Sequence, residues 1–160
     1  MPIDPELAAF LSLESTLVVS AASASGVPEL CLGLACLVDD GGRRLRAVLD
    51  RRSAEPLLAL IGGGCRSVAM VCSRPSTLRT VQVKGADAQL EPLPATRRDE
   101  VARAVAVMRE EFGRVGFGDP YAATLLDHDP AELVCVSFAP VAVFDQTPGP
   151  QAGRSLAASR

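Results

Sequence analysis

TLRTVQVKG, residues 77–85, lies at the centre of the stretch 45–91 that decides the fold. Before it come an apolar segment (LRAVL, 45–49), a basic turn that opens a short helical pattern (DRRSAEPLLALI, 50–61), three glycines and a second apolar segment (SVAMVCS, 67–73). Short apolar and β-branched runs that are bounded by turn residues are typical of strands. The stretch therefore predicts a compact β-α-β-β unit without long loops.

The strand at 77–85 has two different faces. Val81 and Val83 point to one side, because side chains alternate along a strand. The polar side chains on the other face are those of Thr80, Gln82 and Lys84. After Gly85 the apolar positions shift by one residue, which predicts a β-bulge at this glycine. We expect one face to lie in the core and the other to meet a ligand or a partner subunit.

The remaining strand patterns lie on both sides of this unit. They are residues 16–23, 27–38, 43–50 and 133–145. Turn residues at 25–26 and 39–42 join the first three as successive hairpins, which indicates an antiparallel meander. Helical patterns cover 4–13, 54–61 and the region of 101–112, where apolar residues recur at helical spacing. The fold class is mainly β (α+β), with six strands.

At 160 residues the chain is long enough for one hydrophobic core. We expect a single domain over residues 1–147. Residues 148–160 are rich in Pro, Gly, Ser and Ala, so we expect a flexible tail.

Composition excludes several function classes. A net charge of −3, the absence of Trp and the presence of a single Tyr argue against a nucleic-acid partner that stacks bases. No apolar run reaches the roughly 18 residues that a membrane helix needs, and the N-terminus lacks the basic and apolar layout of a signal peptide. We therefore expect a cytoplasmic protein without a membrane partner.

Metal and nucleophile chemistry have little support in the sequence. The five cysteines are scattered, without a Cys-x-x-Cys pair, which favours reduced thiols packed in the core over a metal site. The single histidine, His128, lies between two aspartates, where a flexible acidic loop is favoured over a metal or haem ligand. No Gly-x-Ser-x-Gly elbow occurs, so hydrolysis by a serine nucleophile is disfavoured.

Two constellations carry possible chemistry. Arg51, Arg52 and Ser53 lie where a strand meets a helix, with Ser53 as a candidate N-cap. Two guanidinium groups beside a helix N-terminus suit a phosphate group, although a solvated surface turn has the same composition. On the polar strand face, Gln82 can hydrogen-bond a flavin ring and Lys84 can stabilise negative charge on it. The alternative there is the exposed face of an antiparallel sheet.

The order of elements and the stretch 45–91 resemble the pyridoxamine 5'-phosphate oxidase-like FMN-binding proteins. Members of that family often carry an Arg-Gln-Val-x-Val-x-Gly strand where this chain has residues 79–85. The resemblance covers about residues 7–91 and, more weakly, 133–146. It implies an antiparallel six-stranded split β-barrel with flanking helices. It also implies a homodimer that binds FMN at the subunit interface.

Carried over to this chain, the resemblance implies three groups of cofactor-binding residues. The strand that lines the flavin is Arg46, Ala47 and Val48. The phosphate turn is Arg51, Arg52 and Ser53. The strand beside the ring carries Arg79, Thr80, Gln82 and Lys84. The resemblance supplies no catalytic acid or base.

The chain also departs from the family pattern. Both arginines precede Ser53, and Glu55 follows it where the family commonly has a basic pair. Thr80 stands where the family has its ring-contacting glutamine. The Arg-Leu-His-Asp-Arg segment with which true pyridoxamine phosphate oxidases hold their substrate is absent. We therefore do not expect pyridoxamine phosphate oxidation.

Two functions follow from the resemblance. The first is an FMN-dependent oxidoreductase that transfers hydride or electrons between a small substrate and an acceptor. The alternative is a non-catalytic protein on the same fold that binds or senses a flavin, a deazaflavin or haem.

Overall fold

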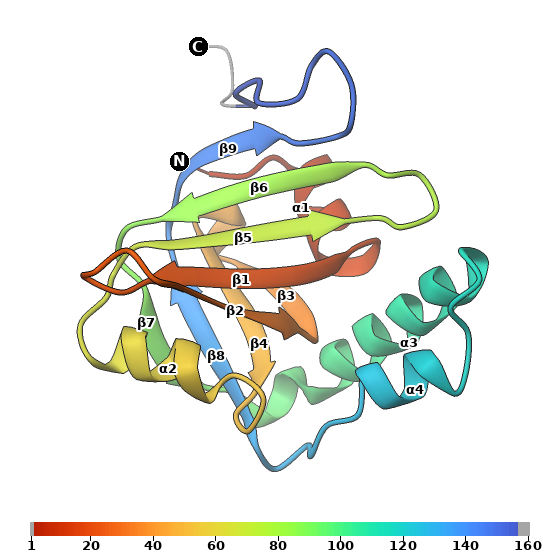
Figure 1. The fold of residues 1–160 in the computed structure, drawn as a ribbon, viewed down its shortest axis with the longest axis horizontal. Coiled ribbons are helices and arrows are strands. Elements are labelled where there is room, and N and C mark those ends of the chain that lie inside the picture. Colours follow the sequence, from red (N-terminus) through yellow and green to blue (C-terminus); the bar gives the residue numbers. More distant parts are fainter. Residues whose placement is uncertain (1, 157–160) are drawn as a thin grey trace.

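The structure, a computed structural model, describes residues 2–156, and the strands of this region form two antiparallel sheets (Figure 1). Sheet A contains, in spatial order, β2 (Pro28–Gly33), β1 (Thr16–Ala22), β5 (Val68–Ser73), β6 (Thr80–Gly85) and β9 (Pro140–Asp145). Sheet B contains β3 (Ala35–Asp39), β4 (Arg44–Asp50), β8 (Leu133–Phe138) and β7 (Gln89–Pro92). The strands of the two sheets run in different directions in Figure 1, with sheet A in front.

The six-strand expectation needs correction, because the described residues contain nine strands in sheets of five and four. Two long strand patterns each contribute one strand to each sheet. The patterns 27–38 (β2 and β3) and 133–145 (β8 and β9) are divided in this way, and the strand at 77–85 (β6) continues past its bulge as β7. No ladder among the described strands joins the two sheets into one closed barrel.

The divided strands change sheets at residues that allow the chain to bend. The register shift between Lys84 and Gly85 confirms the predicted bulge. A Cβ atom at Gly85 would lie 2.4 Å from Cδ2 of the fully buried Phe138, so a side chain has no room there. Gly33 ends β2 and Pro140 begins β9 at the other two crossings. The bends explain why one strand pattern in the sequence became two strands.

Four helices flank the sheets in the described residues. They are α1 (Pro5–Leu13), α2 (Glu55–Gly62), α3 (Arg98–Arg114) and α4 (Tyr121–Leu125), with short 3₁₀ turns η1 (Asp40–Gly42) and η2 (Ala95–Arg97). Asp4 caps α1, since its Oδ1 accepts the Leu7 N–H at 2.8 Å. Within residues 2–156, none of the helices has the length and apolarity that crossing a membrane requires.

The main core lies between the two sheets, and α1 and α2 contribute to it through residues such as Phe10 and Leu57. A second cluster joins the outer side of sheet B to α3 through Val48, Val101 and Met108. No described helix lies in front of β1, β5 and β6 in Figure 1. The outer face of sheet A is therefore left without a covering layer.

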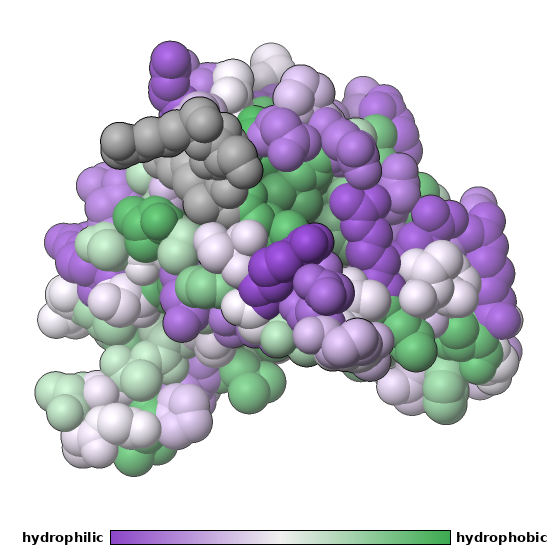
Figure 2. Space-filling model, turned by 90° about the horizontal axis from the view of Figure 1, so that it is seen from above, coloured by the Kyte–Doolittle hydropathy of each residue, from purple (hydrophilic) through white to green (hydrophobic). Residues whose placement is uncertain are grey.

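The described part of the C-terminal tail folds back along β9. Gly153 donates its N–H to the Asp145 carbonyl at 2.7 Å, and Leu156 donates to the Val143 carbonyl at 2.8 Å. From above, this end of the molecule presents hydrophilic and hydrophobic residues side by side (Figure 2). The expected flexible segment 148–160 thus has backbone hydrogen bonds as far as Leu156, and residues 157–160 lie outside the described residues.

Candidate functional site

The outer side of sheet A, hereafter the open face, is the uncovered surface of the fold. Its central row crosses all five strands through paired positions, namely Leu32, Val18, Val71, Gln82 and Phe144. A parallel row consists of Leu30, Ser20, Ala69, Lys84 and Ala142. Lys84 is the one charged residue in these two rows. These two rows are therefore largely apolar, although the exposed side of an antiparallel sheet is usually polar, and a third row on the same face, Thr16, Ser73 and Thr80, is polar.

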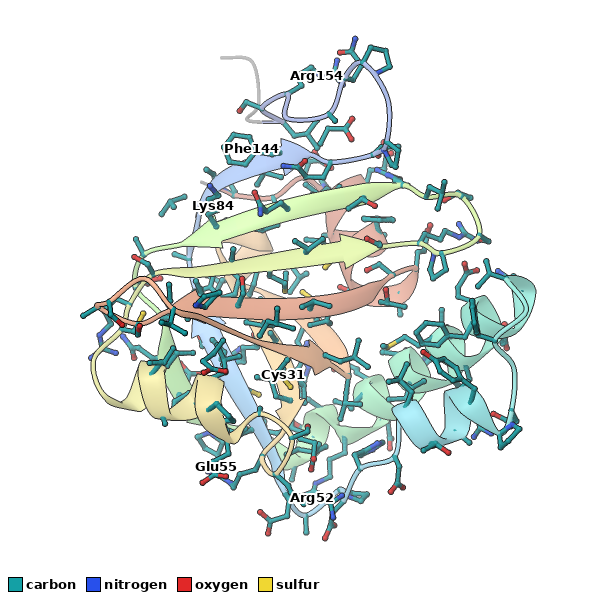
Figure 3. All side chains as sticks on the ribbon, in the orientation of Figure 1. Cys31, Arg52, Glu55, Lys84, Phe144 and Arg154 are labelled. Atoms are coloured by element: carbon teal, nitrogen blue, oxygen red, sulfur yellow. The ribbon has the colours of Figure 1, made fainter. Side chains whose placement is uncertain are left out.

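Gln82 and Lys84 supply polar groups on this apolar face. The Gln82 amide has no hydrogen bond within residues 2–156. The Lys84 ammonium lies over the Phe144 ring, 5.3 Å from its centroid, and Figure 3 shows the two side chains next to each other. Both polar groups are thus available to a ligand on the open face, and both lie on the strand face that the alternation of the sequence predicted.

The other two predicted residues, Thr80 on β6 and Arg79 just before it, already interact with other side chains of the protein. The Thr80 hydroxyl lies 3.0 Å from both Ser73 Oγ and the Leu78 carbonyl. The Arg79 guanidinium stacks 4.4 Å from the Phe10 ring centroid and pairs with Glu6 at 3.4 Å. Arg79 therefore anchors helix α1 and does not face the open sheet.

The turn between β4 and α2 is closed by Asp50, which ends β4. The Ser53 N–H donates to Asp50 Oδ2 at 3.2 Å, and the Ser53 hydroxyl donates to the Asp50 carbonyl at 3.2 Å. The expectation that Ser53 caps α2 is wrong, because the residue at the N-cap is Ala54 and no side chain accepts a hydrogen bond there. Both donors of Ser53 are used inside the turn.

A cavity of about 380 Å³ lies beside this turn. We call it the turn cavity; its lining is Leu30, Cys31, Leu32, Leu34, Asp50, Arg52, Ser53, Thr124, Leu125 and Asp127. Leu30 and Leu32 belong to the open face as well. The turn cavity is therefore continuous with the open face along the edge formed by β2.

The two arginines of the turn take different directions. Arg51 Nε lies 3.7 Å from the Glu132 carboxylate, in a second cavity of about 630 Å³ that also contains Glu55. Arg52 borders both cavities, and its guanidinium has no hydrogen bond or ion pair within residues 2–156. Figure 3 shows Arg52 and Glu55 at the lower end of the molecule, with Cys31 above them. Of the predicted phosphate turn, Arg52 and Ser53 share the turn cavity.

The predicted flavin-lining strand lies elsewhere. The side chains of Ala47 and Val48 are fully buried, and their strand is paired on both sides, with β3 and β8. Arg46 donates to Glu91 at 2.9 Å and also pairs with Asp39. Ala47 faces the main core between the sheets, and Arg46 and Val48 lie on the outer side of sheet B, so none of the three lines the open face or the turn cavity.

Cys31 is the thiol closest to the turn, with its Sγ 3.9 Å from Ser53 Oγ. Burial raises the pKa of this thiol, and the contact with Ser53 offsets only part of that shift. A neutral thiol is a poor nucleophile. Cys31 therefore contributes to the shape of the cavity more than to its chemistry.

His128 lies outside the turn cavity, with its Nδ1 2.8 Å from the Leu126 carbonyl oxygen. Within residues 2–156 no group of three or more His, Cys, Asp or Glu side chains has an arrangement that would hold a metal ion.

No protein-family model and no curated protein sequence matches the chain. Its structure is similar to that of a candidate pyridoxamine 5'-phosphate oxidase from Lactobacillus delbrueckii, with a TM-score of 0.53 and 13% identity over 89% of this chain and 93% of that chain. The chain has the fold of the pyridoxamine 5'-phosphate oxidase-like proteins. The resemblance to this fold is thereby confirmed, whereas its six strands are replaced by nine in two sheets of the described residues and the homodimer stays a prediction.

Two further solved structures are similar to the chain with TM-scores below 0.5. An F420 reductase gives a TM-score of 0.49 and 19% identity, over 84% of this chain and 93% of that chain. A pyridoxamine 5'-phosphate oxidase-related, FMN-binding protein from Nostoc punctiforme gives 0.45 and 19% identity, over 85% of this chain and 77% of that chain. The cofactors in these names are those of the two proteins named.

Proposed function

We propose that the protein is a homodimeric flavin-binding oxidoreductase that holds FMN or a related flavin between the open faces of two copies. The observation that supports this most strongly is the continuity of the open face with the turn cavity through Leu30 and Leu32. A flat apolar surface suits an isoalloxazine ring, and an adjoining polar cavity suits the ribityl chain and its end group.

The composition of the open face supports the proposed dimer. Val18, Val71 and Leu32 form an apolar centre that no described helix covers. Large apolar surfaces of this kind mark interaction sites. A second copy presents the same surface across a two-fold axis. Lys84 is the one charged side chain of the two rows that such an interface has to accommodate.

The side chains present fit a flavin. Gln82 offers to the polar edge of a ring an amide, and Arg52 offers to an anionic group a guanidinium, that have no partner in the described part of the chain, and Lys84 offers a positive charge. A bound flavin supplies hydride or electron transfer between a small substrate and an acceptor. The chain's own residues would bind and orient it, and the open faces of the two copies would exclude water from its ring.

Arg52 and Arg51 are a matched pair for testing this site. Arg52→Ala should weaken FMN binding by about tenfold or more, because a charge-assisted hydrogen bond contributes about 1.5–3 kcal/mol. Arg51→Ala should change the affinity by less than about threefold, because Arg51 pairs with Glu132 in the other cavity. Flavin fluorescence titration measures both constants. Equal affinities for folded Arg52→Ala and wild-type protein would remove Arg52 from the site.

A further inference from the structure

Asp50 is a buried acid at the wall of the turn cavity, with 5% of its surface exposed. Its Oδ2 accepts the Ser53 N–H, whereas its Oδ1 has no hydrogen-bond partner within residues 2–156. No cation among the described residues forms an ion pair with it. Oδ1 is not among the fully enclosed polar atoms that lack a partner in the described residues, so it reaches the space of the turn cavity, where an external donor can bind it.

The charges around the turn cavity favour a ligand group that donates hydrogen bonds over an anionic ligand group. Its lining contains the two acids Asp50 and Asp127 but one guanidinium, that of Arg52. The Ser53 N–H and hydroxyl, which a phosphate in this turn would use, already donate to Asp50. A phosphate group would therefore gain Arg52 but meet a buried like charge and find the turn's donors occupied.

We propose that Asp50 determines the ligand specificity of this cavity, so that it takes a hydroxyl- or amine-bearing end of the ligand and gives a phosphate little advantage. A ribityl hydroxyl can donate to the free Oδ1 of Asp50, which a phosphate dianion cannot do. The inference rests on the proposed flavin function. It adds that the chain binds riboflavin about as tightly as FMN, because repulsion by Asp50 offsets attraction by Arg52.

The test compares FMN and riboflavin on the same full-length protein by fluorescence titration. Wild type should bind the two flavins with affinities within about threefold of each other. Asp50→Asn should tighten FMN binding by about tenfold or more, because it removes a charge from a site of low effective dielectric. Its affinity for riboflavin should change by less than about threefold, because the asparagine oxygen still accepts the Ser53 N–H and its NH₂ group can donate to the oxygen of a ribityl hydroxyl.

Asp50→Ser serves as a second uncharged variant that retains an acceptor for the Ser53 N–H, and circular dichroism checks that each variant is folded. An unchanged FMN-to-riboflavin ratio in both folded variants would overturn the role of Asp50, as would a wild-type preference for FMN above about tenfold. Both of these results leave flavin binding itself intact. If wild type binds neither flavin, the proposed function falls, and the inference falls with it.

Discussion

Replacing Val71 with lysine should convert the protein from a dimer into a monomer. Val71 lies at the centre of the open face, on β5, where it is paired with Val18 on one side and Gln82 on the other. In a two-fold interface each substitution occurs twice, so Val71→Lys places two like charges near the axis. An unpaired buried charge costs several kcal/mol of binding free energy, which is enough to dissociate a dimer of ordinary affinity. Sedimentation equilibrium should then give the mass of one chain.

Val115→Lys is the matched control, because Val115 is 38% exposed at the end of α3 and belongs to a different surface. It should leave the dimer intact. The loss of the interface should also abolish flavin binding by Val71→Lys at concentrations that saturate wild type. A dimeric Val71→Lys protein with unchanged flavin affinity would contradict the assignment of the open face.

Gly85→Ala should lower the free energy of unfolding by about 3 kcal/mol, near the upper end of overpacking effects. The new Cβ would lie 2.4 Å from Phe138 Cδ2 and 2.9 Å from Phe138 Cβ. Phe138 has no exposed surface, and its strand is held in register by β4, so the ring has no free space to enter. Urea denaturation gives the change in stability, and a loss below about 1 kcal/mol would show that the crossing between sheets is not tightly packed.

Gly113→Ala provides the control for that substitution. Gly113 lies in α3, and a Cβ atom there meets nothing within 4 Å. Alanine favours a helix over glycine by about 1 kcal/mol, so this variant should be slightly more stable than wild type.

The period-two pattern of the sequence predicted the local features of the fold but not the pairing between distant strands. Val81 and Val83 are buried and Gln82 and Lys84 face outward, as alternation predicts, and the bulge lies at Gly85. Alternation within a strand does not identify its neighbours. The division of long patterns between two sheets therefore became evident only from the register of the ladders.

The candidate site was predicted in part. Arg52 and Ser53 lie at the cavity, but Arg51 turns toward Glu132, a residue far along the chain that no local pattern connects to it. Arg46 lies on the outer side of β4 together with Val48. Because Leu45 faces the core and side chains alternate along a strand, the sequence pattern by itself indicates that Arg46 faces away from the core between the sheets. Asp50 was missed because an aspartate before two arginines is also a common turn residue.

Saturable binding of a flavin by wild-type protein is the central claim, and a fluorescence titration with FMN tests it most directly. The account predicts quenching of the flavin emission that saturates at one flavin per chain, together with a species of twice the chain mass in sedimentation equilibrium. Flavin emission and polarisation that do not change up to high protein concentration would contradict it.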